Sequence, residues 1–215
     1  MKRTRLPFIE LFTKISLPFA LLMIITLNTN AQSLFSTVAD ALNTGGNCYR
    51  LTTAEVSKRG AVWYNNKIDL NNNFDISYTL NFGNRQSWSG GDGMAFVLQP
   101  ANLSQIGISG SGKGYGNTYD GNGNITVPGI SPSVVVEYDT YDDNGGTNAL
   151  VSLLLNGDFR RTVPANTPVG QVSMGFVNDG LDHTCRVTWN AGTKTITAYT
   201  EIGRASCRER VFKDV

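Results

Sequence analysis

The residue types best suited to binding a ligand lie in three short stretches of this 215-residue chain. In the first, Asp92 stands among glycines at the start of an apolar run. An aspartate there either closes a turn on its own backbone or presents its carboxylate at the mouth of a strand. In the second, Glu137 and Asp139 lie two residues apart, so a strand would point both to one face. Two carboxylates so close together need a cation, a shared proton or solvent.

The loop after this pair adds oxygen atoms, because Asp142, Asp143 and Asn144 follow in sequence. A ligand set made only of oxygens favours Ca²⁺, which takes about 6–8 of them. The alternative is a solvated acidic strand end. The third stretch contains the single histidine, His183, which no serine or cysteine precedes in a nucleophile motif, so we interpret it as structural.

Nearly every segment within residues 46–200 has the pattern of a β-strand. Cys185, Val187 and Trp189, for example, share one face of a strand whose other face is polar. Gly, Asn and Asp separate the segments, as hairpin turns require, and the single helix candidate is 35–42. Many short strands joined by turns predict an all-β sandwich or barrel. The predicted strands are 47–53, 61–64, 75–82, 93–98, 133–141, 149–155, 171–177, 183–189 and 195–199.

The composition argues against several other classes of protein. Charged residues make up 16% of the chain, against about 25% in typical domains, and 23 residues are glycine, which disfavours coiled coils and helical bundles. Residues 32–203 contain 10 Lys and Arg against 14 Asp and Glu. This mildly acidic body is not expected to bind nucleic acid. A single histidine excludes a His-rich metal site.

Residues 1–31 have the pattern of a secretory signal peptide. A basic start precedes an apolar run over residues 17–27, and Thr29 and Ala31 mark a cleavage site. The run is about eleven residues long, whereas a helix needs about 20 to span a membrane. We therefore expect cleavage near Ala31, and a mature chain without a membrane span that is secreted or displayed at the cell surface.

Residues 202–215 do not continue the preceding strand pattern. They begin IGRASCRERV, which resembles the translation of a common sequencing adapter, so we set them apart as non-native; the alternative is an ordinary basic tail. The domain is then expected over residues 32–201, truncated at its C-terminus. Cys207 falls in the tail, which leaves Cys48 and Cys185 as either a disulfide or two separate buried thiols.

Three motifs together resemble the bacterial branch of the legume-type (L-type) lectins, in the concanavalin A-like lectin/glucanase superfamily. They are GGDGMAFVLQ (90–99), GISPSVVVEYDTYDDN (129–144) and LDHTCRVTWNAGTKTITAYT (181–200). The resemblance covers residues 34–200. It implies a concanavalin-like jelly-roll β-sandwich of two antiparallel sheets that binds glycans or polysaccharide without catalysis.

The resemblance also implies particular site residues. Asp92 would accept hydrogen bonds from sugar hydroxyls, and the Gly91–Asp92 bond would be a cis peptide enforced by bound calcium. The family's Asn that binds calcium and also donates to sugar is replaced by Asp143, unless Asn144 takes its role through a one-residue slip. Calcium would be held by Glu137, Asp139, the backbone carbonyl of Tyr141, and Asp143.

The Gly-rich loop 110–116 completes the implied sugar pocket. Gly112 and Tyr115 would contact the sugar, with the ring of Tyr115 or of Trp88 stacked on its apolar face. In the family, a further Asp and a His complete a transition-metal site, but the matching stretch here reads TNAL (147–150). A second, Mn²⁺-type site is therefore not expected.

Two other functions stay open beside a calcium-assisted sugar-binding domain. One is a structural β-sandwich of a surface adhesin whose sugar site has decayed. The other is a retaining glycosidase of the same fold, which needs two carboxyl groups about 5–5.5 Å apart. The spacing of Glu137, Asp139 and Asp142 resembles the glycosidase pattern only in part, so we expect no enzyme. Replacing Glu137 with Gln would abolish hydrolysis if the chain were one.

Overall fold

The structure is a computed structural model that describes residues 33–85, 90–141, 149–160, 170–201 and 207–212. The chain divides into two compact units, Met1–Ser33 and Leu34–Val215, and the strands belong to the second. The predicted signal peptide therefore lies outside the described residues. Within those residues, no helix has the length and apolar character needed to cross a membrane.

The described residues form strands β1 to β14 and one short 3₁₀ turn, Gly110–Gly112, which confirms the all-β prediction. Each predicted strand is present, with ends shifted by a few residues. The strands are β1 (Phe35–Ala39), β2 (Leu42–Gly45), β3 (Cys48–Arg50), β4 (Gly60–Tyr64), β5 (Phe74–Asn81), β6 (Gly93–Leu98), β7 (Thr118–Tyr119), β8 (Ile125–Val127), β9 (Val134–Asp139), β10 (Ala149–Leu155), β11 (Gly170–Gly175), β12 (Asp182–Asn190), β13 (Thr195–Glu201) and β14 (Cys207–Phe212).

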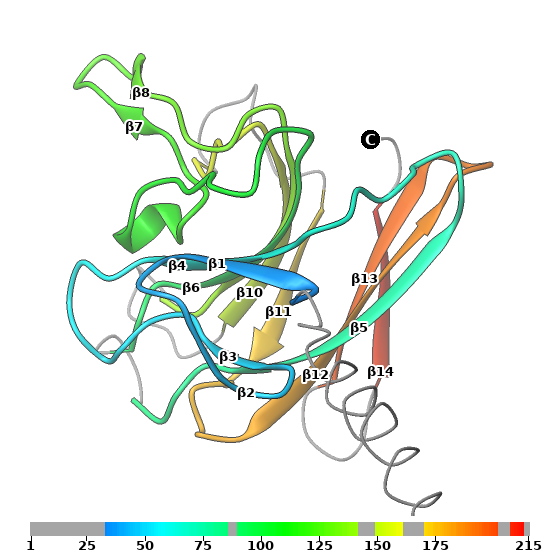
Figure 1. Cartoon of the computed structure of the whole chain (residues 1–215), viewed down its shortest axis with the longest axis horizontal. Coiled ribbons are helices and arrows are strands. Elements are labelled where there is room, and N and C mark those ends of the chain that lie inside the picture. The colour runs from blue at the N-terminus through cyan, green and yellow to red at the C-terminus, as the bar shows by residue number, and fades with distance from the viewer. Residues whose placement is uncertain (1–32, 86–89, 142–148, 161–169, 202–206, 213–215) are drawn as a thin grey trace, which may run out of the picture. The chain divides into compact units, whose positions relative to one another are not determined.

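Two four-stranded antiparallel sheets form a sandwich, as predicted (Figure 1). Sheet 1 has the order β11-β10-β9-β6 and sheet 2 the order β14-β13-β12-β5. Val136 and Leu153 of sheet 1 pack in one core with Val187 and Ile196 of sheet 2. Three two-stranded sheets, β1-β4, β2-β3 and β7-β8, accompany the sandwich.

Strand β9 is buried on both of its faces. Val136 and Tyr138 belong to the main core between the sheets. Val135 instead packs on the outer face of sheet 1, in a second cluster with Tyr115 and Ile130 from the long connection between β6 and β9. This double burial explains why β9 has an almost continuous apolar sequence rather than a strict alternation.

The helix prediction for residues 35–42 was wrong. Phe35–Ala39 forms β1, which pairs antiparallel with β4, and Leu42 begins β2. The stretch contains Thr37 and Val38, whose branched side chains fit a strand better than a helix. Pairing with β4 satisfies the backbone groups of so short a segment, for which an isolated helix would be too short to be stable.

The disulfide considered for Cys48 and Cys185 is absent, and both thiols are free. Cys185 is buried on the core face of β12, whereas Cys48 is exposed on the β2–β3 hairpin. The alternative prediction was two separate buried thiols. The thiols are separate, but only Cys185 is buried. Part of the segment that we set apart, Cys207–Phe212, forms β14 and pairs with β13.

Replacing Leu153 with Ala is expected to lower the free energy of unfolding by about 2–5 kcal/mol, because a large side chain with 0% exposure leaves a cavity in the main core. The matched control is Leu181→Ala, since Leu181 is 64% exposed and its truncation should change stability by about 0.5 kcal/mol or less. Urea unfolding measures both variants. Equal losses of unfolding free energy in the two variants would contradict the burial of Leu153 in the main core.

The two free thiols are expected to differ in reactivity. Burial raises the pKa of the Cys185 thiol to about 12, and the reactive form of a thiol is the thiolate. Peptide mapping after iodoacetamide treatment of the native protein should find Cys48 alkylated and Cys185 unmodified until denaturant is added. A Cys48–Cys185 cross-linked peptide from unreduced protein would refute the assignment.

Candidate functional site

The paired carboxylates lie on the outer face of sheet 1, as their spacing predicts. Because β9 alternates, Glu137 and Asp139 point away from the main core that Val136 and Tyr138 enter. Glu137 is 0% exposed and Asp139 is 5% exposed. The four cross-strand neighbours of this pair carry no charge, and they are Gly93, Ala95, Leu150 and Ser152.

A lysine and a tyrosine from the long β6–β9 connection cover the pair. The Nζ atom of Lys113 lies 3.5 Å from Oε2 of Glu137 and 3.4 Å from Oδ1 of Asp139. The hydroxyl of Tyr115 donates a hydrogen bond to the same Glu137 oxygen. The cation that two adjacent carboxylates require is thus supplied, at least in part, by the chain itself.

The turn that carries Asp92 is fixed beside the end of β9. The backbone N–H of Thr140 donates to the carbonyl of Asp92 at 3.2 Å, and its hydroxyl donates to the carbonyl of Gly91 at 2.6 Å. The structure therefore brings together the first two stretches singled out in the sequence. Gly93 permits this approach, because a Cβ atom there would lie 2.1 Å from the carbonyl oxygen of Tyr138.

The cis peptide expected at Gly91–Asp92 is not present. In the described part of the chain, the one cis bond is Ser131–Pro132. A trans bond is favoured by about 3–4 kcal/mol for a non-proline residue, and the two hydrogen bonds from Thr140 are compatible with it.

The sugar-stacking role expected for Tyr115 does not fit its environment. The side chain is 1% exposed and packs with Ile130, Val135 and Leu154, so its ring has no face available to a ligand. Its hydroxyl is engaged by Glu137. Tyr115 therefore belongs to the buried apolar cluster that covers the outer face of sheet 1.

The remaining predicted site residues have different positions. Gly112 is buried at the end of the 3₁₀ turn, and Tyr141 is partly exposed just after β9. Asp143, Asn144 and Trp88 lie outside the described residues.

The acid pair does not fit a divalent metal ion while Lys113 is in place. A metal bound to Glu137 and Asp139 would have to share their oxygens with an ammonium group already within 3.5 Å of both. Across the described ranges, no group of three or more His, Cys, Asp or Glu side chains is positioned to hold a metal. The calcium set expected from the resemblance is not supported at these two residues.

His183 is structural, as interpreted from the sequence. It is buried on β12, and its Nε2 lies 3.1 Å from the carbonyl oxygen of Val177 and 3.0 Å from Oδ1 of Asp179. The backbone N–H of Leu181, aided by His183, holds the pKa of the Asp179 carboxyl below its usual value.

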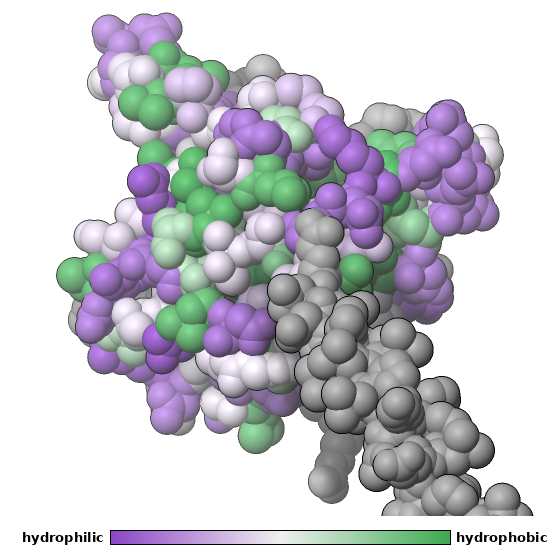
Figure 2. Space-filling view, in the orientation of Figure 1, coloured by the Kyte–Doolittle hydropathy of each residue, from purple (hydrophilic) through white to green (hydrophobic). Residues whose placement is uncertain are grey.

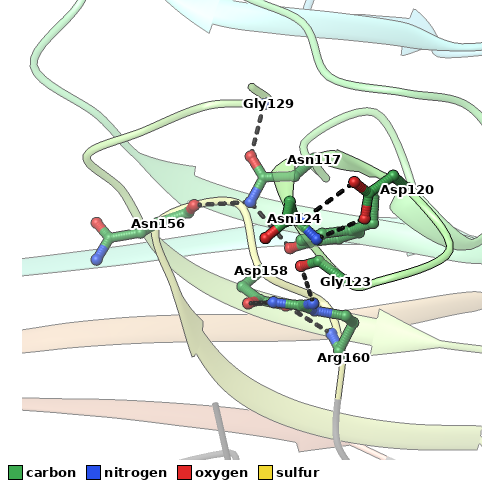
Figure 3. Close-up of polar contacts among 9 residues, drawn as sticks. Asn117, Asp120, Gly123, Asn124, Gly129, Asn156, Asp158 and Arg160 are labelled. Atoms are coloured by element: carbon green, nitrogen blue, oxygen red, sulfur yellow. Dashed lines mark hydrogen bonds and ion pairs between the residues drawn. The ribbon is translucent and has the colours of Figure 1, made fainter. Parts of the chain in front are cut away.

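An asparagine fixes the β6–β9 connection to the end of β10 (Figure 3). Asn117 is buried, and its side-chain oxygen accepts the N–H of Gly129 at 2.7 Å. Its amide nitrogen donates to the carbonyl of Asn156 at 3.3 Å and to the hydroxyl of Tyr119 at 3.0 Å. These bonds join three segments that are distant in sequence.

Arg160 holds the β7–β8 hairpin in the same region (Figure 3). Its guanidinium makes two bonds to the Asp158 carboxylate, at 3.0 and 2.7 Å, and donates to the carbonyl of Gly123 at 2.8 Å. It also lies 3.7 Å from the centre of the Tyr119 ring. The hairpin projects at the upper left of Figures 1 and 2, where exposed apolar residues of β8 lie beside polar ones.

Sequence analysis missed Lys113 and Arg160. The available signal for Lys113 was that it is the one lysine or arginine between residues 100 and 132, in a loop next to two carboxylates that need a cation. Arg160 had a weaker signal, because nothing local indicates that it reaches Gly123.

Replacing Arg160 with Met is expected to loosen the β7–β8 hairpin, because a charge-assisted anchor to Gly123 and Asp158 is lost. Amide hydrogen exchange over residues 118–127 should accelerate roughly tenfold or more. Arg186→Met is the control, since Arg186 forms a comparable bidentate pair with Asp75 on an exposed strand face. Equal exchange rates over residues 118–127 in the two variants would contradict a role of Arg160 in holding the β7–β8 hairpin.

The pH dependence of this anchor follows from Asp158. Burial raises the pKa of its carboxyl, but hydrogen bonds from Arg160 outweigh that effect and hold the pKa below its usual value. The pair therefore contributes its full stability above about pH 4, near the unfolded-state pKa. Its contribution is lost as the pH falls through the lowered folded-state pKa.

Comparison with known proteins agrees with this architecture. A family model described as the legume lectin beta-barrel domain matches residues 25–213. The "Serine-rich adhesin for platelets" of Staphylococcus aureus (strain MRSA252) is 31% identical over 129 residues, which are 59% of this chain and 8% of the adhesin. The chain thus spans less than a tenth of the length of the curated relatives it matches.

Two solved structures have a similar fold. Peanut lectin with a 9mer peptide (PVIWSSATG) aligns with a TM-score of 0.63 and 19% identity, over 85% of this chain and 77% of the lectin. The exoplasmic/lumenal domain of VIP36, in a Ca²⁺/Man-bound form, aligns with a TM-score of 0.56 and 18% identity, over 82% and 68% of the two chains. Because the family model covers most of the residues and the fold agrees, this chain belongs to the legume (L-type) lectin domain family.

Proposed function

We propose that this domain binds glycans without catalysis, as part of a secreted or cell-surface protein. Family membership supports sugar binding, and the similar VIP36 domain is a Ca²⁺/Man-bound form. The staphylococcal relatives are named as adhesins, which supports a position at the cell surface after removal of residues 1–31.

The observation that carries the proposal is the position of Asp92. Its turn is held against the end of β9 by Thr140, and its carboxylate is partly exposed at the mouth of β6. Asp92 is one of the many residues that line a large hollow of this domain. An ionised carboxylate accepts several hydrogen bonds, which suits neighbouring hydroxyls on a sugar ring.

The other contacts in this proposal come from the loop after β9. Asp143 and Asn144 lie outside the described residues and are proposed from the sequence, and the side chain of Asn144 can both donate and accept hydrogen bonds. Sugar binding here uses no metal held by Glu137 and Asp139, since Lys113 engages both carboxylates.

Burial of Glu137 supports binding rather than hydrolysis. A glycosidase must bring one carboxyl group to the glycosidic oxygen and the other to the sugar carbon or a water. Glu137 is 0% exposed beneath Tyr115 and Lys113, so its carboxylate does not reach the hollow.

Replacing Asp92 with Ala is expected to lower affinity for the bound glycan by roughly tenfold to a hundredfold, because hydrogen bonds to a charged acceptor are lost. The binding glycan is first identified by screening the unmodified protein on a broad glycan array. Asp75→Ala is the control, since Asp75 pairs with Arg186 on another face and should leave binding unchanged. Thermal unfolding confirms that both variants are folded.

Two results would overturn the proposal. One is unchanged affinity in the Asp92 variant. The other is no binding to any glycan by the folded, unmodified protein, which would favour a structural β-sandwich of an adhesin.

A further inference from the structure

Lys113 occupies a backbone conformation that favours glycine. Its φ and ψ are 45° and 33°, at the end of the 3₁₀ turn Gly110–Gly112. The neighbouring left-handed positions, Gly110 and Gly114, are both glycine. This region disfavours residues with a side chain, whereas glycine adopts it readily. The Lys113 side chain nonetheless makes contacts that a glycine at this position could not make.

The contacts of the Lys113 side chain are those of a buried charge. The side chain is 5% exposed, and its Nζ donates to the carbonyl of Ser111 at 3.0 Å. The same atom lies 3.5 Å from Glu137 and 3.4 Å from Asp139. One ammonium thus stands nearly equidistant from two carboxylates that are themselves almost fully buried.

No strand neighbour could replace this ammonium. The residues beside the acid pair on β6 and β10 are uncharged. Buried carboxylates are tolerated only when opposite charge and hydrogen bonds compensate for lost hydration. Tyr115 supplies one such hydrogen bond to Glu137, and Lys113 supplies positive charge to both residues.

A divalent ion at the pair would compete directly with Lys113. Ca²⁺ binds carboxylate oxygens at about 2.3–2.6 Å. An ion bound to Oε2 of Glu137 or to Oδ1 of Asp139 would stand within about 6 Å of the Lys113 Nζ, which lies 3.5 Å from the first oxygen and 3.4 Å from the second. Mutual repulsion in a buried site opposes this double occupancy.

We propose that the Lys113 ammonium replaces a resident divalent ion at the Glu137–Asp139 pair, so that this face of the lectin domain is held together without metal. Lys113 is then a positioning residue that keeps the ends of β9 and β6 in place. The proposal does not rest on sugar binding, and its test reads metal response and stability alone.

The test compares Lys113→Gln with unmodified protein by thermal unfolding, first in EDTA and then with excess Ca²⁺ or Mn²⁺. The unmodified protein should show the same Tm in all three conditions. Lys113→Gln should lower the Tm in EDTA by about 10 °C, because the buried carboxylates lose the positive charge of Lys113. Either ion should then raise its Tm, since the vacated space admits a metal. A structural role for the lysine stem alone would give no such gain of metal response.

The matched control is Lys194→Gln. Lys194 also has a left-handed backbone, with φ of 54°, but it is exposed in the β12–β13 turn. Its substitution should leave both the Tm and the lack of metal response unchanged. A comparable Tm for the two glutamine variants, or a Tm of the unmodified protein that rises with Ca²⁺ or Mn²⁺, would overturn the proposal.

A second variant decides the matter if Lys113→Gln does not fold. Lys113→Gln combined with Glu137→Gln and Asp139→Asn removes all three charges while retaining similar shapes. This triple variant should fold and show a cooperative thermal transition in EDTA, because the charges that Lys113 compensates are removed together with it. A triple variant as unstable as the single one would refute a role in charge compensation.

Discussion

The site depends on one constraint, which is that β9 has no solvent-exposed face. Val136 and Tyr138 fill the core between the sheets, so Glu137 and Asp139 must face the other way. That side is closed too, by Tyr115 and the residues around it. Two carboxylates are therefore held where water cannot solvate them, and some group must bring positive charge to them. The long connection before β9 supplies both the apolar cover and, through Lys113, the charge.

The connection can do this because its own path is fixed by polar contacts rather than by a helix or a large core. Asn117 ties it to Gly129 and Asn156, and Arg160 ties its hairpin to the segment after β10. Close backbone packing contributes as well, since a Cβ atom at Gly107 would lie 2.3 Å from the backbone of Tyr115. These fixed points determine where Lys113 and Tyr115 meet the sheet.

The sequence predicted the sandwich well because its strands are amphipathic or doubly apolar and glycine-rich turns separate them. Strand β12 is the clearest case, with Cys185, Val187 and Trp189 buried in alternation. The shared face of Glu137 and Asp139, and their need for a cation, a shared proton or solvent, followed from spacing and charge alone. The sequence did not predict that Lys113 supplies the positive charge, because its contacts depend on how the 35-residue connection between β6 and β9 folds over the sheet. The errors at Cys48 and at Tyr115 have the same origin, since each concerned a long-range contact that local pattern does not encode.

The position of the Asp92 turn is set by Thr140, the residue that follows Asp139. The resemblance to L-type lectins implies that bound calcium enforces a cis peptide bond before Asp92. In such a protein, loss of the metal would displace the aspartate. Here the bond is not cis, and Thr140 holds both carbonyls of the turn through its N–H and its hydroxyl. The position of Asp92 therefore depends on where Thr140 lies, and Thr140 directly follows the carboxylate that Lys113 neutralises. An internal ammonium can thus fix the Asp92 turn indirectly, by holding the end of β9, without contacting the turn itself.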